Sequence, residues 1–241
     1  MNLYSVAWNY LKYRTRPGIL LRWVVLKATL LANIKDNSNI VDLGGFDGTI
    51  PHFLKQIIPS IQVTIVDLDS SGLEVAQSRG FQVINASATD IPGIDDDTID
   101  VVFCMDLLEH VKEDEAIIHE SARMLKRHGL LIITTPFEGG IPFPLLDKST
   151  TRTINLGWGH VRLGYSLNRV RELLENCDLH IIYSTTFNNP ITRFFNGLQF
   201  KIPMLRRFFK FLDLFCMAFE PFLRFGGKEH LVIARMGSDQ G

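Results

Sequence analysis

The fold of this chain is decided by one short stretch, Val41-Asp42-Leu43-Gly44-Gly45-Phe46-Asp47-Gly48. It joins an apolar run, residues 39–43, to a helical pattern that begins at Thr49. Glycine lets the backbone turn tightly and approach a ligand without a Cβ in the way, and the following helix offers free N–H groups. This context predicts a buried strand, a ligand-binding loop and a helix. The alternative is a tight strand–helix turn that holds no ligand.

Outward from this loop, short apolar runs alternate with helical patterns. Strands are expected over residues 39–43, 62–66, 81–84, 99–105, 130–134, 180–185 and 230–235, and helices over 49–58, 70–79, 113–127 and 166–177. Gly80 and Gly129 are interpreted as stop signals of the helices before them. Repeated strand–helix–strand units with short loops imply an α/β fold, with a parallel sheet and helices on both faces.

The pattern breaks at two places, which sets the expected domain organisation. We predict an N-terminal basic helical flank over residues 1–35, a core over residues 36–186 and 229–241, and a Phe-rich basic helical insertion, or cap, over residues 187–228. The first flank carries six Lys or Arg and no acid, and the insertion carries seven Lys or Arg against two acids. Because the net charge is −1, the rest of the chain carries about −12. Such asymmetry often marks contact with an anionic surface.

Composition bounds the class of protein. A hydrophobic fraction of 46% and a charged fraction of 21% are typical of a globular domain. The three cysteines are far apart and form no CxxC pair, which argues against a disulfide framework or a zinc site, and no metal site is predicted. Without a recognisable signal peptide, a cytoplasmic location is expected. The best candidate for a membrane span, residues 18–34, is interrupted by Arg22 and Lys27.

The loop favours one class of cofactor over another. A dinucleotide loop needs glycines in a G-x-G-x-x-G register, and from Gly44 that register falls on Phe46 and Thr49. This argues against a nicotinamide cofactor. At the end of the next strand stands Asp67, whose carboxylate can accept two hydrogen bonds from a ribose diol, while Leu68 can lie against a purine face. The alternative is that Asp67 is an ordinary strand-end acid that caps the following helix.

Five motifs in order carry a family resemblance. They are Asp42 with Gly44 and Gly48, then Asp67, then Ala86-Ser87-Ala88-Thr89-Asp90-Ile91-Pro92, then Asp106-Leu107-Leu108-Glu109-His110-Val111, then the passage from Leu125 to Pro136. The run from Ile40 to Pro136 resembles the core of class I S-adenosylmethionine-dependent methyltransferases. It is most similar to the small-molecule branch that includes the ubiquinone-biosynthesis enzymes.

The resemblance implies a Rossmann-like, mostly parallel seven-stranded sheet with the last strand reversed, a helical cap, and S-adenosyl-L-methionine as cofactor. The cofactor-binding residues are then expected to be Asp42, Gly44, Gly45, Gly48, Asp67, Leu68, Ser87, Ala88 and Met105. Two positions depart from the family pattern. Phe46 replaces a usual loop glycine, and Ser87 replaces the aspartate that accepts a hydrogen bond from the adenine amino group.

Methyl transfer mainly requires alignment of the acceptor, so the family has no universal catalytic residue. His160 lies in a glycine-rich loop after the fifth strand and is our candidate base; the alternative is a loop histidine that bonds its neighbours. His110 is expected to order the Glu109 loop. Arg162 and Tyr165 are candidates for orienting the acceptor.

The flanks allow three interpretations: a cap packed on the core, a surface that lies on a membrane and brings a lipid-linked acceptor to the site, or an oligomer interface. The oligomeric state stays open, and no nucleic acid is expected. We expect methyl transfer to a small molecule that is lipid-linked, quinone-like or a saccharide, in a protein that is cytoplasmic or peripheral to the inner face of a membrane. The alternatives are a non-catalytic protein that kept the fold and another Rossmann enzyme with a nucleotide cofactor.

Overall fold

The computed structural model describes residues 17–223 and 225–237. One sheet has the strand order β3-β2-β1-β4-β5-β7-β6. The strands are β1 (Asn39–Leu43), β2 (Gln62–Asp67), β3 (Gln82–Asn85), β4 (Ile99–Met105), β5 (Leu125–Pro136), β6 (Leu179–Phe187) and β7 (Glu229–Met236). β1 to β5 pair in parallel, and β7 is antiparallel to both β5 and β6. The predicted seven-stranded, mostly parallel sheet with a reversed last strand is therefore confirmed.

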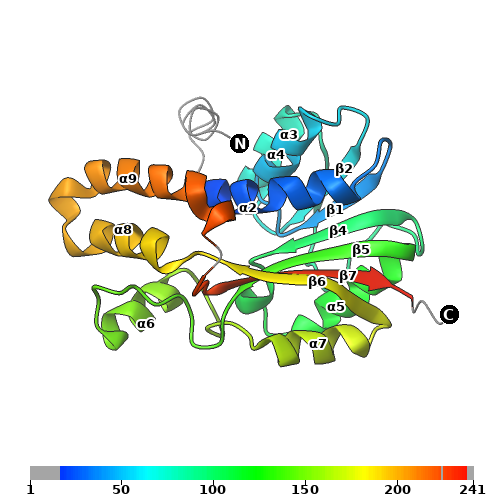
Figure 1. The fold of residues 1–241 in the computed structure, drawn as a ribbon. Helices are drawn as coiled ribbons and strands as arrows, with labels where there is room; N and C mark the ends of the chain where they lie inside the picture. The colour runs from blue at the N-terminus through cyan, green and yellow to red at the C-terminus, as the bar shows by residue number, and fades with distance from the viewer. Residues whose placement is uncertain (1–16, 224, 238–241) are drawn as a thin grey trace.

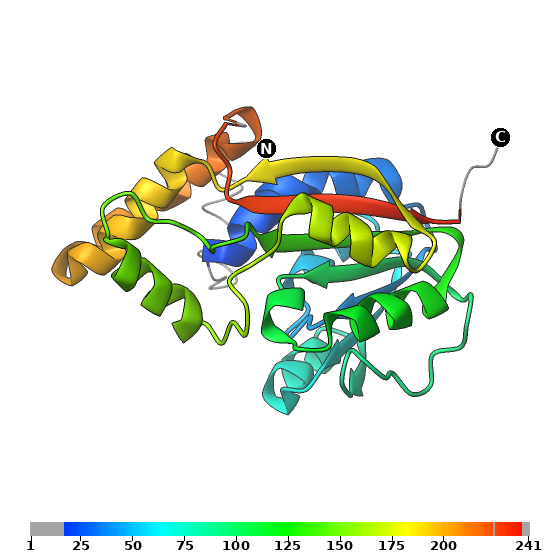
Figure 2. The same cartoon turned by 90° about the horizontal axis from the view of Figure 1, so that it is seen from below.

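Helices cover both faces of the sheet (Figure 1). The α-helices are α2 (Pro17–Asn33), α3 (Thr49–Lys55), α4 (Ser70–Ser78), α5 (Asp114–Met124), α6 (Lys148–Gly157), α7 (Leu167–Glu175), α8 (Pro190–Lys201) and α9 (Arg206–Phe219); short 3-10 turns are η1 (Leu108–His110), η2 (Pro203–Leu205) and η3 (Glu220–Phe222). One buried apolar cluster joins α2, α3 and α4 to one face, and a second joins α5 and α7 to the other. Helices α8 and α9 form a hairpin that projects beyond the end of the sheet (Figures 1 and 2).

The N-terminal flank packs against the sheet where the structure describes it. Helix α2 is described over Pro17–Asn33. Leu20, Leu26 and Leu30 are fully buried, and the ring of Trp23 lies 5.4 Å from that of Phe53 in α3. The expected flank thus forms a core-covering helix, while residues 1–16 lie outside the described part of the chain.

Two element predictions are wrong at their ends. The helix expected over residues 113–127 stops at Met124, because Leu125 pairs with Ile99 and opens β5. Gly129 consequently lies inside a strand rather than at the end of a helix. The helix expected over residues 49–58 ends at Lys55.

Helix α6 was not expected from the sequence. It buries only Thr151 and Asn155, so it shows no apolar periodicity. Asp147 caps its first turn by accepting a hydrogen bond from the Thr150 amide at 2.9 Å. The Asn155 side chain bonds both the amide and the carbonyl of Ile141, at 2.8 and 3.1 Å, and so holds the segment that follows β5. Among residues 17–223 and 225–237, no helix has the length and hydropathy of a membrane span.

Candidate active site

Parallel register gathers the predicted cofactor residues at one edge of the sheet. The pairs at this edge are Leu43 with Val66 and Cys104, Asp67 with Asn85, and Met105 with Thr134. The residues that follow these strand ends therefore lie side by side at the carboxyl edge, where ligands bind in open α/β sheets. All nine predicted cofactor residues belong to β1, β2, β4 or the loops that leave β1, β2 and β3.

The glycine loop is tight and its backbone is bare. Gly44 has φ 65°, and its amide donates to the Val66 carbonyl at 2.8 Å, which ties the loop to β2. A Cβ on Gly45 would lie 2.6 Å from Asp42 Oδ2, so a larger residue there would displace the buried carboxyl. Gly48, with φ 65°, is the residue from which α3 begins. The turn needs glycine at these positions for backbone and steric reasons.

The Asp67 carboxylate bonds the backbone of the glycine loop, and it is not the residue that caps α4. Its Oδ2 accepts a hydrogen bond from the Phe46 amide at 2.8 Å, and its Oδ1 accepts one from the Asp69 amide at 2.8 Å. Asp69 caps α4 instead, by accepting from the Ser71 amide at 2.9 Å. The adjoining Leu68 is 73% exposed. An apolar side chain exposed beside a carboxylate suits the face of a purine whose ribose is held by that carboxylate.

Phe46 keeps the backbone geometry of the glycine it replaces. Its φ is 48°, in the left-handed region that L-residues rarely adopt. Its ring packs on Gly72 of α4, where an added Cβ would lie 2.4 Å from Phe46 Cδ2. The Phe46 ring therefore fits only because residue 72 has no side chain.

The loop concentrates negative charge. Burial, together with the charges of Asp67 and Asp47, raises the pKa of Asp42 to about 8. Asp42 is only 5% exposed. A cation bound at this edge would relieve the repulsion among the three carboxyl groups.

The remaining predicted cofactor residues are less distinctive. The Ser87 hydroxyl lies 2.7 Å from that of Thr89 and also accepts a hydrogen bond from the Thr89 amide at 3.3 Å. Ala88 packs against the buried cluster on the α5 side of the sheet, and Met105 against the cluster on the other side. Asp106 follows Met105, and its amide donates to the Thr134 carbonyl at 2.8 Å.

A cavity of about 510 Å³ adjoins this edge at Asp106. It lies between the end of β4, the first turns of α2, the segments on either side of α6, and helices α8 and α9. Phe143, Trp158 and Phe200 supply aromatic walls. Polar groups reach it from Arg22, Asp106, His110, His160, Asn188, Asn196, Gln199 and Glu229. An apolar chamber with a few convergent polar groups is the usual form of a small-molecule site.

His160 lies on the cavity and is buried. Its ring meets that of His110 edge to face, with 4.7 Å between centroids, and its Nδ1 has no hydrogen-bond partner among the described residues. Burial, His110 and Arg22 lower its pKa to about 4, so the imidazole is neutral at pH 7. The loop is held in place because the Glu109 carbonyl accepts from the amides of Val161 and Arg162, at 2.9 and 3.3 Å.

The same corner has the composition of a metal site. Ligand atoms of Glu109, His110 and His160 all lie within 4.8 Å of one another. Glu109 is fully buried, its Oε1 has no hydrogen-bond partner among the described residues, and burial raises its pKa to about 7. The sequence did not reveal this cluster, because His160 is far from the other two in the chain.

A trio of charged residues in the cavity was not predicted from the sequence. Arg22 of α2 forms an ion pair with Asp106 at the end of β4 and lies 3.6 Å from the carboxylate of Glu229 at the start of β7. Asp106 further accepts a hydrogen bond from the Thr134 hydroxyl at 2.7 Å. Arg22 looked like one of six basic residues in the flank, and nothing in its sequence neighbourhood set it apart.

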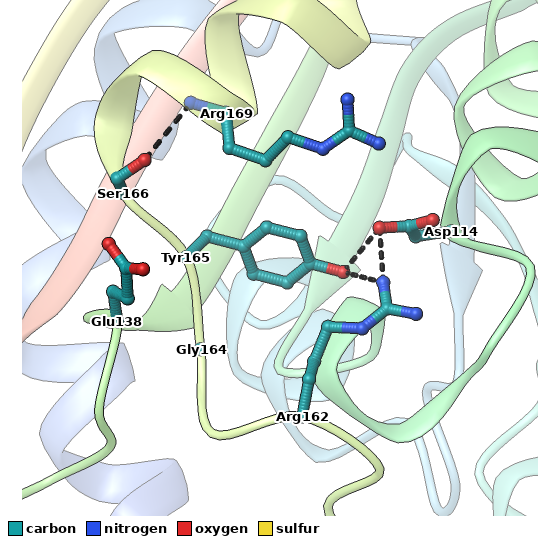
Figure 3. A pocket seen from close by; sticks show the side chains of 7 residues that line it. All are labelled: Asp114, Glu138, Arg162, Gly164, Tyr165, Ser166 and Arg169. Carbon is teal, nitrogen blue, oxygen red and sulfur yellow. Dashed lines mark hydrogen bonds and ion pairs between the residues drawn. The ribbon is translucent and has the colours of Figure 1, made fainter.

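Arg162 and Tyr165, predicted to orient the acceptor, do not line the cavity. They lie in a separate depression of about 310 Å³ with Asp114 (Figure 3). The Tyr165 hydroxyl bonds Asp114 at 2.8 Å, and the Arg162 guanidinium bonds both Asp114 and the Lys112 carbonyl. This network fastens the loop after α6 to the start of α5, so the two side chains are already engaged in structure.

Comparison with known proteins agrees with this arrangement. Residues 41–133 match the family model described as "Methyltransferase domain". The Ubiquinone biosynthesis O-methyltransferase of Xanthomonas oryzae pv. oryzae (strain PXO99A) is 30% identical over 104 residues, which cover 41% of this chain and 43% of that protein. A probable S-adenosylmethionine-dependent methyltransferase of Mycobacterium tuberculosis (strain CDC 1551 / Oshkosh) is 32% identical over 100 residues, covering 39% of this chain and 36% of that protein.

The similarity in sequence is confined to part of the chain, and the match spans less than half the length of these curated relatives. The fold extends further. A geranyl diphosphate methyltransferase solved in complex with SAM superposes with a TM-score of 0.64 at 12% identity, over 92% of this chain and 86% of that one. The resemblance predicted from the sequence is therefore confirmed for the segment that carries the glycine loop and strands β1 to β4.

Proposed function

We propose that this chain, whose residues 41–133 match the methyltransferase-domain family, transfers a methyl group from S-adenosylmethionine to a small-molecule acceptor. The observation that carries the proposal is the contact between two sites at the end of β4. Met105 belongs to the predicted cofactor edge, and the next residue, Asp106, lines the cavity. A group held at one site therefore lies beside a group held at the other.

The cofactor edge suits a cationic nucleoside. Asp67 has a carboxylate beside the exposed Leu68, which fits a ribose and a purine, and the bare backbone at Gly44 and Gly45 leaves room for an amino-acid tail. The acidic surroundings of Asp42 favour positive charge. When bound, S-adenosylmethionine supplies a methyl group on a sulfonium, which is a good leaving group.

The cavity would align the acceptor and limit its contact with water. The cofactor, when bound, would supply the methyl group, and the cavity residues would hold the acceptor oxygen in line with it. Alignment of this kind contributes about 7–11 kcal/mol. The proton would leave the acceptor oxygen for the imidazole of His160, the candidate base, because this ring is neutral at pH 7, lines the cavity and has an Nδ1 without a partner among the described residues.

The proposal extends to the class of acceptor. Aromatic walls formed by Phe143, Trp158 and Phe200 favour a quinone-like or lipid-linked hydroxyl compound over a saccharide. We also include peripheral contact with the inner face of a membrane through residues 187–228. The curated relative from Xanthomonas oryzae is named for ubiquinone biosynthesis, which is consistent with this class of acceptor.

Calorimetry with S-adenosylhomocysteine tests the cofactor site. Wild-type protein is expected to bind it, and Asp67→Asn is expected to weaken binding about 10- to 100-fold, since a hydrogen bond to a charged group contributes about 1.5–3 kcal/mol. Asp95→Asn, at an exposed position in the loop before β4, is the matched control and should bind like the wild type. Absence of heat at millimolar ligand would favour a protein that kept the fold without the cofactor.

A further inference from the structure

Buried polar atoms without a partner gather around one cavity. Among residues 17–223 and 225–237, the side-chain atoms of this kind are Arg22 Nε, Glu109 Oε1, His160 Nδ1, Asn188 Oδ1 and Glu229 Oε2. Four of these five residues line the 510 Å³ cavity, and the fifth, Glu109, lies in the cluster with His160. Because an unbonded buried polar atom is costly, such a concentration indicates that a polar ligand supplies the missing bonds.

These atoms fall into two groups. His160 meets the ring of His110 and belongs to the corner that holds the candidate base. The other group, here called the polar subsite, consists of Arg22 from α2, Asn188 just after β6 and Glu229 at the start of β7. Its members are close together, since the Asn188 amide nitrogen donates to Glu229 Oε1 at 2.7 Å and Arg22 Nη2 lies 3.6 Å from Glu229 Oε2. The cavity therefore has a polar subsite apart from its candidate base.

The polar subsite is rigid before any ligand binds. Asn188 and Glu229 are only 4% and 3% exposed. The antiparallel ladder pairs Phe187 with Glu229, which sets Asn188 beside that carboxylate. The Asn188 carbonyl also accepts a hydrogen bond from Arg193 Nε at 3.0 Å. Because these groups are already fixed, a ligand that bonds them loses little affinity to ordering of the protein.

The free atoms of the polar subsite select one chemical group. Asn188 Oδ1 and Glu229 Oε2 are acceptors, whereas Arg22 Nε is a donor. One hydroxyl can accept from Arg22 and donate to either acceptor. A carboxylate has no proton to donate and would repel Glu229, and an ammonium cannot accept and would repel Arg22. The subsite therefore suits an uncharged hydroxyl.

We infer that the methyl acceptor carries, besides the oxygen that is methylated, a second and uncharged hydroxyl that binds Arg22, Asn188 and Glu229. The inference rests on the proposed function, because it concerns the acceptor of that reaction. It narrows the acceptors to compounds with two oxygen groups, one of which stays free, and excludes a carboxylate or an ammonium at the second position. Recognition of the hydroxyl itself requires no cofactor, so it can be measured apart from methyl transfer.

Calorimetry of the full chain with three matched probes tests the inference. The probes are 4-hexylresorcinol, with two hydroxyls, 4-hexylphenol, which lacks one of them, and 2-hexyl-5-hydroxybenzoate, in which a carboxylate replaces that hydroxyl. The wild type is expected to bind 4-hexylresorcinol at least about tenfold more tightly than 4-hexylphenol, because the second hydroxyl bonds charged groups. It should bind the carboxylate probe no more tightly than 4-hexylphenol.

Two variants assign the preference to the polar subsite. Arg22→Lys keeps the positive charge but lacks the Nε donor, and Glu229→Gln places an N–H donor where Oε2 accepts. Each should reduce the preference for 4-hexylresorcinol over 4-hexylphenol to less than about threefold. The matched control Glu220→Gln changes a glutamate that is 2% exposed, bonds Asn189 and Thr192, and is not part of the cavity wall. It should keep the wild-type preference.

Equal affinity of the wild type for 4-hexylresorcinol and 4-hexylphenol, or no binding of either at millimolar concentration, would overturn the inference. Ordered water would then supply the missing bonds. Variants that weaken both probes by the same factor would also overturn it, since a purely structural role of Arg22 and Glu229 has that effect. Unfolding midpoints report whether the variants are folded, and the wild-type probe series stands without them.

Binding of S-adenosylhomocysteine separates this inference from the proposed function. If the wild type binds that nucleoside but does not prefer 4-hexylresorcinol, the second hydroxyl is rejected and methyl transfer stands. If it prefers 4-hexylresorcinol but does not bind the nucleoside, the polar subsite stands as a hydroxyl-binding site and methyl transfer is rejected.

Discussion

Phe46 holds a left-handed backbone conformation at a position where glycine is the usual residue. Such a conformation costs an L-residue about 1–2 kcal/mol. The cost is tolerated because the ring packs on Gly72, where no side chain competes for the space. The phenylalanine in the loop and the glycine in α4 therefore fit each other.

This pairing predicts non-additive stability. Gly72→Met alone should lower the free energy of unfolding by about 1–3 kcal/mol, because the new side chain meets the ring of Phe46. In a Phe46→Gly background the same substitution should cost less by at least about 1 kcal/mol. Urea unfolding of the four proteins measures the coupling. Additive costs would mean that the ring can move away from Gly72, and a loss of S-adenosylhomocysteine binding in Phe46→Gly alone would place the ring in the cofactor site.

Asp42 gives the protein a specific response to pH. Its pKa rises on folding from 3.8 to about 8, so the folded state binds more protons than the unfolded state between those values. The free energy of unfolding should therefore fall as pH rises through that window, by at most about 1.4 kcal/mol per pH unit. Asp42→Asn keeps the shape of the neutral acid and should reduce this slope, while Glu109, whose pKa burial raises to about 7, should keep part of it.

Unfolding midpoints from pH 5 to pH 9, without ligand, measure this effect. The variant should be more stable than the wild type above pH 8, where the wild-type carboxyl is charged and buried. Asp90→Asn, at an exposed position, should follow the wild-type profile. Parallel profiles for wild type and Asp42→Asn would show that Asp42 is ionised in the folded protein.

The sequence pattern grouped the predicted cofactor residues but not the cavity residues, for a physical reason. Asp42, Gly44 and Asp67 stand at strand ends, and a regular parallel sheet brings strand ends together whatever the rest of the chain does. Arg22 and Glu229 meet only through the packing of α2 and the reversed strand β7, at opposite ends of the chain. The local sequence pattern around either residue therefore does not predict that their side chains lie together.

At the scale of elements, α2 does more than cover the core. It carries Arg22 into the cavity, where the guanidinium pairs with Asp106 and approaches Glu229, which is 3% exposed. Arg22→Gln should lower the free energy of unfolding by about 3 kcal/mol, because it leaves buried carboxylates without their cation. Denaturant unfolding measures this cost, which should shrink when Glu229→Gln is added.

A matched control lies one turn along the same helix. Lys27 stands over the ring of Trp23, 5.9 Å from its centroid, and Lys27→Gln should cost no more than about 1 kcal/mol. If Arg22→Gln and Lys27→Gln lowered the free energy of unfolding equally, loss of any positive charge on α2 would explain the effect. A cost for Arg22→Gln that Glu229→Gln does not reduce would assign the effect to Asp106 alone.

Elements with strong apolar periodicity were predictable, and those defined by tertiary contacts were not. Helix α5 ends earlier than predicted because Leu125 pairs with Ile99 of β4. A local helical pattern does not contain this contact. Helix α6 is held by Asp147 and Asn155, polar residues whose bonds to nearby backbone replace an apolar face. Helix α9 buries Leu214, Met217 and Ala218 and leaves Phe208, Phe215 and Phe219 exposed, a division that residue type alone does not predict.

At the scale of the whole molecule, the predicted cofactor edge and the cavity adjoin at Asp106. The cofactor edge is formed by the regular sheet, whereas the cavity is closed by α2, α8, α9 and the segments around α6. Asp106 belongs to the strand end and to the cavity. Substitutions in the cap should therefore change acceptor binding and leave cofactor binding alone.

Trp158→Ala is the sharpest test of that separation, because Trp158 lies at the cavity mouth and far along the chain from the glycine loop. Loss of one aromatic wall should weaken binding of the acceptor by about 1–3 kcal/mol, which corresponds to a dissociation constant roughly 10- to 100-fold higher. With labelled S-adenosylmethionine and a fractionated cell extract, the amount of extract needed for half-maximal transfer should rise accordingly. Affinity for S-adenosylhomocysteine should stay within about twofold, as it should for Ile57→Ala, an exposed control outside the cavity. If Trp158→Ala weakened the binding of S-adenosylhomocysteine as much as the binding of the acceptor, the two ligands would share one site. The sheet and the cap would then not bind separate ligands.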